Sequence, residues 1–270
     1  MTDRQNRALD LIRENVERIQ TSEQWKAALD IRARFHQYSF NNCMLISIQK
    51  PDATLVAGYR KWQEMNRQVR KGETSIAIFA PMMKKVQDEQ TGEWVKRLIG
   101  FRTASVFDVS QTDGEPIPMP PRPEPLTGRD DEAAALWTKI TEYATSLGSP
   151  IALVDDLRGA NGCYHVDSKR IEVVSDLPAL QRVKTAIHEV AHALLHGREN
   201  RPTEYDLGEL EAESAAYLVA DALGIDTGAY SFAYLAHYAG EADDLMKAGQ
   251  NAVKAADAIL AALGEEAQAA

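Results

Sequence analysis

The sequence predicts an α+β protein in two parts: N-terminal helices followed by an antiparallel hairpin, then a mostly helical second part with a small sheet. Two observations lead to this prediction. Apolar residues recur at three- and four-residue spacing over most of the chain, but residues 75–82 and 95–109 show the pattern of strands. A segment with six prolines and two glycines, residues 114–128, separates regions of different charge.

We therefore predict a first domain over residues 1–113, an extended connector over 114–128 and a second domain over 129–270. Proline fixes φ and lacks the N–H donor, so the connector cannot form a regular element. Residues 1–107 contain 18 Lys and Arg against 12 Asp and Glu, whereas residues 108–270 contain 12 against 28. The basic first part suits a polyanionic partner, although two solvated surfaces that merely differ would give the same counts.

Composition indicates an ordinary globular protein, with 44% hydrophobic and 26% charged residues. Cys43 and Cys163 are far apart and form no CxxC pair, which argues against a disulfide framework and a cysteine-rich zinc site. The charged N-terminus lacks the apolar stretch of a signal peptide, and no apolar run reaches the roughly 20 residues of a membrane span. We expect a cytoplasmic protein with no membrane partner.

The elements of the first domain follow from periodicity and from helix-terminating residues. Helices are predicted over residues 9–19, from Ser22 to Phe35, over 41–48 before Pro51, and over 58–66. The two strands of the hairpin then follow, joined by a polar turn at 88–93.

The second domain should contain a helix, three short strands and four more helices. In order, the predicted ranges are a helix at 129–147, a strand at 151–154, two strands within 163–174, and helices at 179–197, 206–224, 230–240 and 243–263. The turn between the two strands at 163–174 is centred on Asp167 and Ser168.

A metal-binding motif lies in the segment TAIHEVAHALLH, residues 185–196. His188 and His192 are four residues apart, so on a helix both imidazoles project from one face and can reach a single zinc ion. Glu189 is placed to accept a proton from a water that the metal activates. The alternative is a buried helix whose histidines are only hydrogen-bonded. We interpret His196, in the last turn of this helix, as structural.

A third ligand is needed, because catalytic zinc keeps three protein ligands and one open position. The next helix contains ELEAESAA, residues 209–216, in which Glu209 and Glu213 share a face while Glu211 points about 200° away. We predict Glu209 as the third ligand and Glu213 as a partner that orients a ligand histidine through its other ring nitrogen. Glu211 is the alternative ligand, and three solvated glutamates are the alternative to any ligand here.

Basic residues of the first domain alternate with aromatic ones, which is typical of proteins that hold single-stranded nucleic acid. The candidate DNA-binding residues are Tyr59, Arg60, Lys61, Trp62, Arg67, Arg70 and Lys71. The alternative is that Trp62 or Tyr59 belongs to the core. Asn41 and Asn42 either hydrogen-bond bases or cap a helix.

Two known families resemble the two halves. The first half is similar to the ArdC-like single-stranded-DNA-binding domain of plasmid antirestriction proteins, through YSFNNCMLISIQKPDATLVAGYRKWQEMNRQVRKGETSIAIFAP (38–81) and VFDVSQTDGEPIP (106–118). The second half resembles the ImmA/IrrE-type zinc metallopeptidases, in which HExxH is followed by a glutamate. ArdC relatives commonly read ELVAE where this chain has ELEAE, which favours Glu209 and Glu213 over Glu211. The resemblance implies a DNA-binding module fused to a zincin-like peptidase domain of mobile-element origin.

We therefore expect a zinc-dependent metalloendopeptidase that binds single-stranded DNA and cleaves an unidentified protein substrate, in an antirestriction or mobile-element role. The alternatives are a non-catalytic protein that shields single-stranded DNA and carries a structural zinc, or an ImmA-like protease that cleaves a repressor. The intact Glu189 favours an enzyme, since a structural site needs no general base. Candidates for stabilising the oxyanion are Tyr230, Tyr234, His237 and Tyr238.

Overall fold

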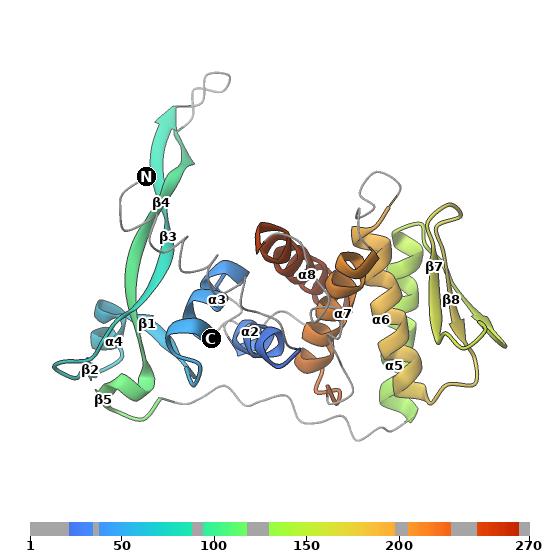
Figure 1. The fold of residues 1–270 in the computed structure, drawn as a ribbon, viewed down its shortest axis with the longest axis horizontal. Helices are drawn as coiled ribbons and strands as arrows, with labels where there is room; N and C mark the ends of the chain where they lie inside the picture. Colours follow the sequence, from blue (N-terminus) through green and yellow to red (C-terminus); the bar gives the residue numbers. More distant parts are fainter. Residues whose placement is uncertain are drawn as a thin grey trace. The chain divides into compact units, whose positions relative to one another are not determined.

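The protein is an α+β molecule in two compact units (Figure 1). The computed structural model describes residues 22–34, 38–87, 94–117, 130–197, 205–227 and 242–264. The predicted helices at 9–19 and 230–240, the turn at 88–93 and most of the proline-rich connector lie outside these residues. Among the described residues, no helix is both long and apolar enough to cross a membrane.

The first unit joins Met1–Arg18 to Asn41–Pro118, and its described part contains most of α3 and two small sheets. Its elements are α3 (Phe40–Gln49), β1 (Val56–Gly58), α4 (Tyr59–Glu64), β2 (Arg67–Val69), β3 (Ile76–Gln87), β4 (Trp94–Asp108), a 3-10 turn (Val109–Gln111) and β5 (Thr112–Gly114). One antiparallel sheet has the order β1-β4-β3, and β2 pairs antiparallel with β5. The predicted helices at 41–48 and 58–66 and both strands of the hairpin are confirmed, whereas β3 extends five residues beyond the predicted strand and the three-residue strands β1, β2 and β5 were not predicted.

Two amide side chains of α3 cover the outer edge of β3. The Asn42 amide donates to the carbonyl of Phe79 and accepts from its N–H, both at 2.9 Å. Gln49 makes the same pair of bonds to Ala77, also at 2.9 Å. Four polar groups of the strand edge are thereby satisfied without another strand. The role of Asn42 is therefore to bind the sheet edge, which sequence reasoning had left open between a base contact and a helix cap.

Asp108 fixes the end of β4 to the segment before β1. Its fully buried carboxylate accepts from the backbone N–H groups of Thr54, Leu55 and Ser110, at 2.7, 3.0 and 2.9 Å. The Asp108 N–H in turn donates to the side chain of Gln111, which completes a capping box. Asp108 therefore has a structural role within the motif that resembles ArdC.

The second unit joins Ile19–Phe40 to Met119–Ala270. Its elements are α2 (Ser22–Arg34), α5 (Asp130–Ser146), β6 (Ile151–Val154), β7 (Gly162–His165), β8 (Arg170–Val174), α6 (Ala179–Leu195), α7 (Tyr205–Ala222) and α8 (Ala242–Leu263). The three strands form a sheet of order β6-β8-β7, with β6 parallel and β7 antiparallel to β8. These helices and strands agree with the predicted ranges to within a few residues.

Helix α2 belongs to this second unit, although we expected residues 1–113 to form one domain. The buried Trp25 indole donates to Ser214 of α7 at 2.8 Å, and Tyr217 of α7 donates to Asp30. Arg32 makes two bonds of 2.9 Å to the carboxylate of Asp257 on α8. The domain boundary expected from charge and proline content is therefore incorrect for α2, because its partners lie about 190 to 225 residues further along the chain.

Candidate metal centre

Helix α6 presents His188 and His192 on one face, one turn apart. Their Nε2 atoms are 3.0 Å apart and their ring centroids 4.7 Å apart. On its other side, this part of the helix is apolar and buried, at Ala186, Ile187 and Val190. Packing on that side fixes the helix rotation and turns both imidazoles towards α7.

Glu209 at the start of α7 completes a set of three ligand atoms. Its two oxygens lie 3.6 Å from Nε2 of His188 and 3.5 Å from Nε2 of His192, and the three groups form the one candidate metal cluster among the described residues. A tetrahedral ion with bonds of 2.0–2.1 Å would separate its ligand atoms by about 3.4 Å. The donor set of two imidazoles and one carboxylate fits Zn²⁺ in both spacing and chemistry.

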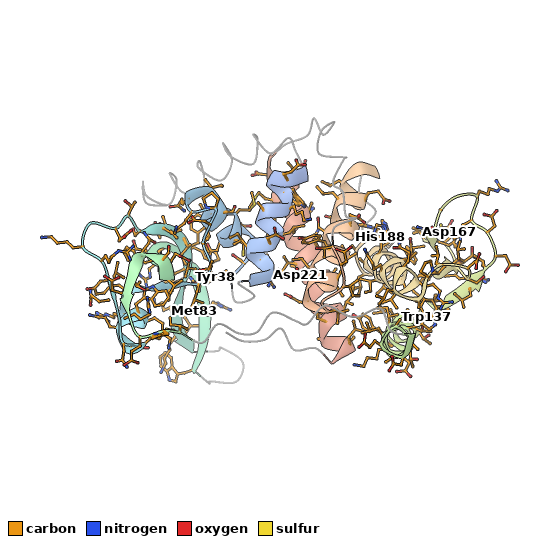
Figure 2. All side chains as sticks on the ribbon, turned by 90° about the horizontal axis from the view of Figure 1, so that it is seen from below. Tyr38, Met83, Trp137, Asp167, His188 and Asp221 are labelled. Atoms are coloured by element: carbon orange, nitrogen blue, oxygen red, sulfur yellow. The ribbon has the colours of Figure 1, made fainter. Side chains whose placement is uncertain are left out.

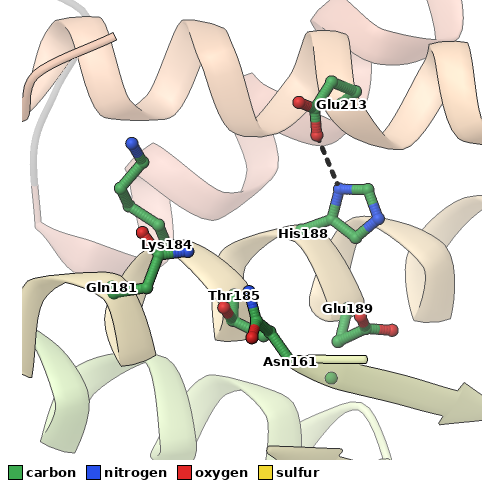
Figure 3. Close-up of a pocket in the computed structure, with 8 residues that line it drawn as sticks. Asn161, Gln181, Lys184, Thr185, His188, Glu189 and Glu213 are labelled. Carbon is green, nitrogen blue, oxygen red and sulfur yellow. Dashed lines mark ion pairs between the residues drawn. The ribbon is translucent and has the colours of Figure 1, made fainter. Parts of the chain in front are cut away.

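Glu213 lies behind the cluster and holds His188 in place. One of its oxygens is 3.2 Å from Nδ1 of His188, and Figure 3 shows this contact between α7 and α6. A metal-binding imidazole commonly donates its other ring N–H to a carboxylate in this way. The fully buried Ala212 and Ala216 allow the two helices to approach closely enough for the contact. Glu209 and Glu213 therefore both lie on the face of α7 that contacts the histidines.

Glu189 points away from Glu213, towards strand β7 (Figure 3). Its side chain is 7% exposed and packs against Gly162, where an added Cβ would lie 2.8 Å from Oε1 of Glu189. Burial raises the pKa of Glu189 to about 7, because it outweighs the attraction of His188 and the backbone hydrogen bond from Tyr164. A carboxylate with this pKa is suited to accept a proton near neutral pH.

The metal ligands differ in charge in the metal-free protein. Burial disfavours the charged imidazole of His188, but hydrogen bonds to Glu209 and Glu213 outweigh it and raise the pKa of His188 to about 10. Burial lowers the pKa of His192. For Glu209, burial is outweighed by hydrogen bonds from both histidines, which hold its pKa well below the usual range. Without metal, the site is therefore an imidazolium–carboxylate pair.

Metal uptake at pH 7 is expected to release about one proton, because the protonated His188 must lose its proton before Nε2 can bind the ion. Affinity should therefore rise with pH, by about tenfold per unit while His188 remains protonated. Calorimetric titration in buffers of different ionisation enthalpy measures the proton count. A binding enthalpy independent of the buffer would contradict this assignment.

A hydrogen-bonded chain continues from His192 away from the metal cluster. Nδ1 of His192 is 2.8 Å from Nδ1 of His196, and Nε2 of His196 is 2.7 Å from Glu211. Asn251 of α8 donates to the second Glu211 oxygen at 2.8 Å. When Nε2 of His192 is a ligand, its Nδ1 carries a proton, so His196 accepts from His192 and donates to Glu211. Glu211 is therefore engaged away from the cluster, and Glu209 is the carboxylate beside the histidines.

Replacing His196 with alanine is expected to lower metal affinity by roughly 10- to 100-fold, since His192 would lose the acceptor that fixes its orientation. The exposed His165, which contacts Glu172 on the neighbouring strand, offers a matched control, and His165→Ala should leave affinity unchanged. Competition with a chromogenic chelator measures both variants. Wild-type affinity in a folded His196→Ala protein would show that the hydrogen bond to His196 does not orient His192.

A cavity of about 270 Å³ opens beside His188 and Glu189. Asn161, Gly162, Gln181, Lys184, Thr185 and Glu213 complete its lining. A reacting group in this cavity would lie next to the expected general base. Sequence reasoning missed Asn161 and Gln181, as well as Asn251 behind the ligands, because no spacing relates these residues to the motif. The four oxyanion candidates between 230 and 238 lie outside the described residues.

The expected DNA-binding residues differ in their exposure and in their hydrogen-bond and ion-pair partners. Arg60 and Lys61 are exposed on α4, and Lys61 pairs with Glu64 at 3.3 Å. Arg67 binds the side chain and carbonyl of Thr112 at 2.7 and 2.9 Å and so joins β2 to β5. Arg70 pairs with Glu73 at 2.7 Å and with Asp113 at 3.4 Å. Tyr59, Arg70 and Lys71 line a hollow of about 570 Å³.

The clearest correction concerns Trp62, which we expected to bind DNA. It is fully buried, and its indole N–H donates to the carbonyl of Phe107 at 2.9 Å, so it has no face on which a base could stack. The core interpretation, given above as the alternative, is the right one. An amphipathic helix places its aromatic residue inward and its basic residues outward, and sequence alone does not show which surface that helix covers.

Trp62→Ala is expected to lower the free energy of unfolding by about 3–5 kcal/mol, because it leaves a large cavity and an unpaired carbonyl. Trp94, which is 69% exposed on β4, is the control, since Trp94→Ala should change stability by less than about 0.5 kcal/mol. Chemical denaturation followed by circular dichroism compares the two. Equal stability of both variants would place Trp62 outside the core.

Fold and site together define an α+β protein of two units, the second of which carries a His–His–Glu candidate metal site beside a buried glutamate. Residues 3–107 match the family model of the N-terminal domain of anti-restriction factor ArdC, which confirms the resemblance expected for the first half. The metal-free crystal structure of the antirestriction protein ArdC from plasmid R388 shares the fold, with a TM-score of 0.57 and 24% identity over 84% of this chain and 85% of that one.

Two further likenesses extend this comparison. The Mn(II)-bound structure of R388 ArdC gives a TM-score of 0.53 and 21% identity over 83% of this chain and 87% of that one. An uncharacterized protein of Bacillus anthracis is 29% identical over 79% of this chain and 42% of its own length. The chain thus spans less than half the length of that relative. The second of the R388 structures shows that a protein of this fold binds a divalent metal.

Proposed function

We propose that the chain is an ArdC-like antirestriction or mobile-element-associated protein that hydrolyses peptide bonds with zinc and binds single-stranded DNA. The observation that supports the enzyme most strongly is the convergence of His188, His192 and Glu209, with Glu189 on the same helix as the two histidines. A merely structural site would need the three ligands but no buried carboxylate with a pKa of about 7. The ImmA/IrrE-type resemblance of the second half supports the same reaction.

The roles of the residues follow from their positions. His188, His192 and Glu209 would hold the ion, with Glu213 and His196 orienting the two imidazoles. When bound, zinc supplies a Lewis acid next to the cavity. Glu189 takes the proton of the attacking water and passes it to the leaving amine, as a buried carboxylate of raised pKa can do. Gly162 allows Glu189 to lie against the backbone of β7 without a clash.

Strand β7 provides a place for an extended peptide. In the described part of the chain it pairs on one side only, with β8. The cavity is lined by Gly162 of β7 as well as by His188 and Glu189. A substrate that adds to the open edge as a further strand would bring its backbone next to the general base. The side chains of such a peptide matter less than its extended form, which fits an unfolded or loop segment of a protein substrate.

DNA binding is assigned to the first unit. The N-terminal part of the chain is basic, with 11 basic against 6 acidic residues over 50–107, and residues 3–107 match the ArdC N-terminal family model. Phosphate contacts by lysine and arginine, with aromatic stacking, hold single strands with little sequence preference. Binding would place the peptidase unit on DNA that enters a cell as a single strand.

The test uses the purified full-length chain, loaded with Zn²⁺ or Mn²⁺, with unfolded casein and with a labelled oligothymidylate. Cleavage that needs metal and stops with chelator supports the peptidase, and retardation of the oligonucleotide at low salt supports DNA binding. Retardation without cleavage, with or without DNA present, would favour the non-catalytic shielding protein instead. Cleavage without any retardation would overturn the DNA-binding half of the proposal.

A further inference from the structure

We propose that single-stranded DNA runs along one face of the β3–β4 hairpin, with bases on Phe101 and Trp94 and a phosphate at Lys85. We call this surface the aromatic track and define it as Phe107, Phe101, Trp94, Lys85 and Met83. It differs from the residues expected from sequence, and it rests on the proposed DNA binding of the first unit. The track gives that function a specific surface.

The register of the hairpin separates its side chains into two faces. Pro81 is opposite Phe101, Lys85 is opposite Lys96 and Gln87 is opposite Trp94. Directly opposed residues in an antiparallel pair point to the same side, and residues two apart share that side. Phe101, Trp94, Met83 and Lys85 therefore share one face with Phe107 at the base of β4. Lys84 and Arg97, also opposite each other, belong to the other face.

Two aromatic rings of this face are exposed. Trp94 is 69% and Phe101 49% exposed, and Met83, labelled in Figure 2, is 50% exposed. Large apolar side chains that are exposed along one face of a hairpin can serve as contacts for a ligand. Trp94 and Phe101 are about 23 Å apart along β4, at 3.3 Å per residue, so they offer two separate stacking positions.

The charges of the strands indicate a polyanion as the occupant. The outer parts of β3 and β4 carry Lys85 on the face of the track and Lys84, Arg97 and Arg102 on the other face, and the one acidic residue of the two strands is the buried Asp108 at the base. The acidic residues of the hairpin, Asp88, Glu89 and Glu93, are confined in sequence to the segment between the strands. A protein-binding surface would be depleted of lysine, whereas lysines beside exposed aromatics are typical of single-strand binding.

The base of the track leads to the hollow described above. Phe107 lines it together with Tyr59, whose ring meets that of Phe107 edge-on at 6.5 Å. Tyr59 is 43% exposed, and the exposed Lys71 lies on the same hollow. Its acidic residues, Glu73 and Asp113, are paired with Arg70. An aromatic pair with an adjacent lysine suits one end of a strand that continues over Phe101 to Trp94.

The faces of the hairpin provide matched controls for a test with the full-length chain. Lys85→Glu and Lys84→Glu make the same charge change at adjacent exposed residues on opposite faces. Trp94→Ala and Phe101→Ala remove rings from the track, whereas Ile99→Ala removes an exposed apolar side chain at the bulge outside it. Affinity for a labelled oligothymidylate is measured by fluorescence anisotropy over a range of salt, with a thermal melt of each variant.

The track predicts that Trp94→Ala and Phe101→Ala each weaken binding by roughly 5- to 150-fold, the loss of one stacked base. Trp94→Phe should restore most of the affinity. Lys85→Glu should weaken binding and reduce the slope of log affinity against log salt by about 0.7. Lys84→Glu and Ile99→Ala should stay within about twofold of wild type, because they lie off the stacked strand.

Each contrary outcome has a distinct meaning. A wild-type chain that does not bind the oligonucleotide at low salt overturns the proposed DNA binding and the track with it. Wild-type binding that Trp94→Ala and Phe101→Ala leave unchanged overturns the track alone. Equal losses of DNA affinity in Lys85→Glu and Lys84→Glu would show that the lysines attract DNA through their charge alone, without a preferred face of the hairpin. A change in self-association, seen by sedimentation without a change in DNA affinity, identifies the face as a contact between copies of the chain.

Discussion

Glu189→Gln is expected to leave the metal bound and the fold intact while lowering peptide hydrolysis by about 100- to 10,000-fold, the usual contribution of a general base. The amide has nearly the shape of the carboxylate, and its oxygen can still accept the backbone hydrogen bond from Tyr164, but it cannot accept a proton from water. Burial that raises the pKa of Glu189 to about 7 makes the carboxylate a better base than an exposed glutamate.

Hydrolysis should also be lost as pH falls through the pKa of Glu189, because the protonated form cannot act as a base. A bound cation lowers that pKa, so the loss should occur below pH 7 in the loaded protein. Metal content, a thermal melt and turnover of a quenched fluorescent peptide are measured on the same preparation. Glu142→Gln, the same change at an exposed position of α5, serves as the control. Undiminished turnover in Glu189→Gln would rule out this mechanism.

Glu209→Ala is expected to remove the metal, with a loss of affinity that exceeds the roughly 10- to 100-fold cost of losing an orienting partner. It would leave His188 and His192 with no carboxylate between their Nε2 atoms. Removing the anion should also lower the pKa of His188 in the metal-free protein, because Glu209 is one of the two carboxylates whose hydrogen bonds raise it.

The Glu211→Ala variant tests the alternative, in which Glu211 and not Glu209 is the third ligand. That variant lacks the carboxylate that binds His196 and Asn251, so it should lose stability and part of its metal affinity but still bind one ion. Elemental analysis after dialysis and chelator competition measure both variants. Full metal content in Glu209→Ala, together with loss in Glu211→Ala, would show that Glu211 is the ligand in solution.

The candidate site could be anticipated because its main constraints are local. Four-residue spacing on one helix is enough to pair His188 with His192, and helical geometry is enough to separate Glu209 from Glu211. The partners behind the ligands could not be found in this way. Asn251 reaches Glu211 from a helix 40 residues further on, and no motif marks it. The pairing of His196 with Glu211 likewise depends on how α6 and α7 pack.

The helices and the hairpin were predictable, but the burial of particular aromatic residues was not. Trp62 and Trp94 both lie near basic residues in sequence, yet one is fully buried and the other is exposed. Their difference comes from tertiary packing of α4 against β4, which a local pattern does not contain. Strands of three residues, such as β1, are too short to show a period at all.

The connection of α2 to α7 and α8 makes the second unit discontinuous in sequence, with Asn41–Pro118 of the first unit lying between α2 and α5. During synthesis, Trp25 and Arg32 emerge long before Ser214 and Asp257, to which they donate hydrogen bonds in the folded protein. Cleavage within the proline-rich segment would therefore not separate the two compact units. The N-terminal piece would keep α2 without the residues that it binds on α7 and α8, and the C-terminal piece would expose Ser214, which is buried in the folded protein.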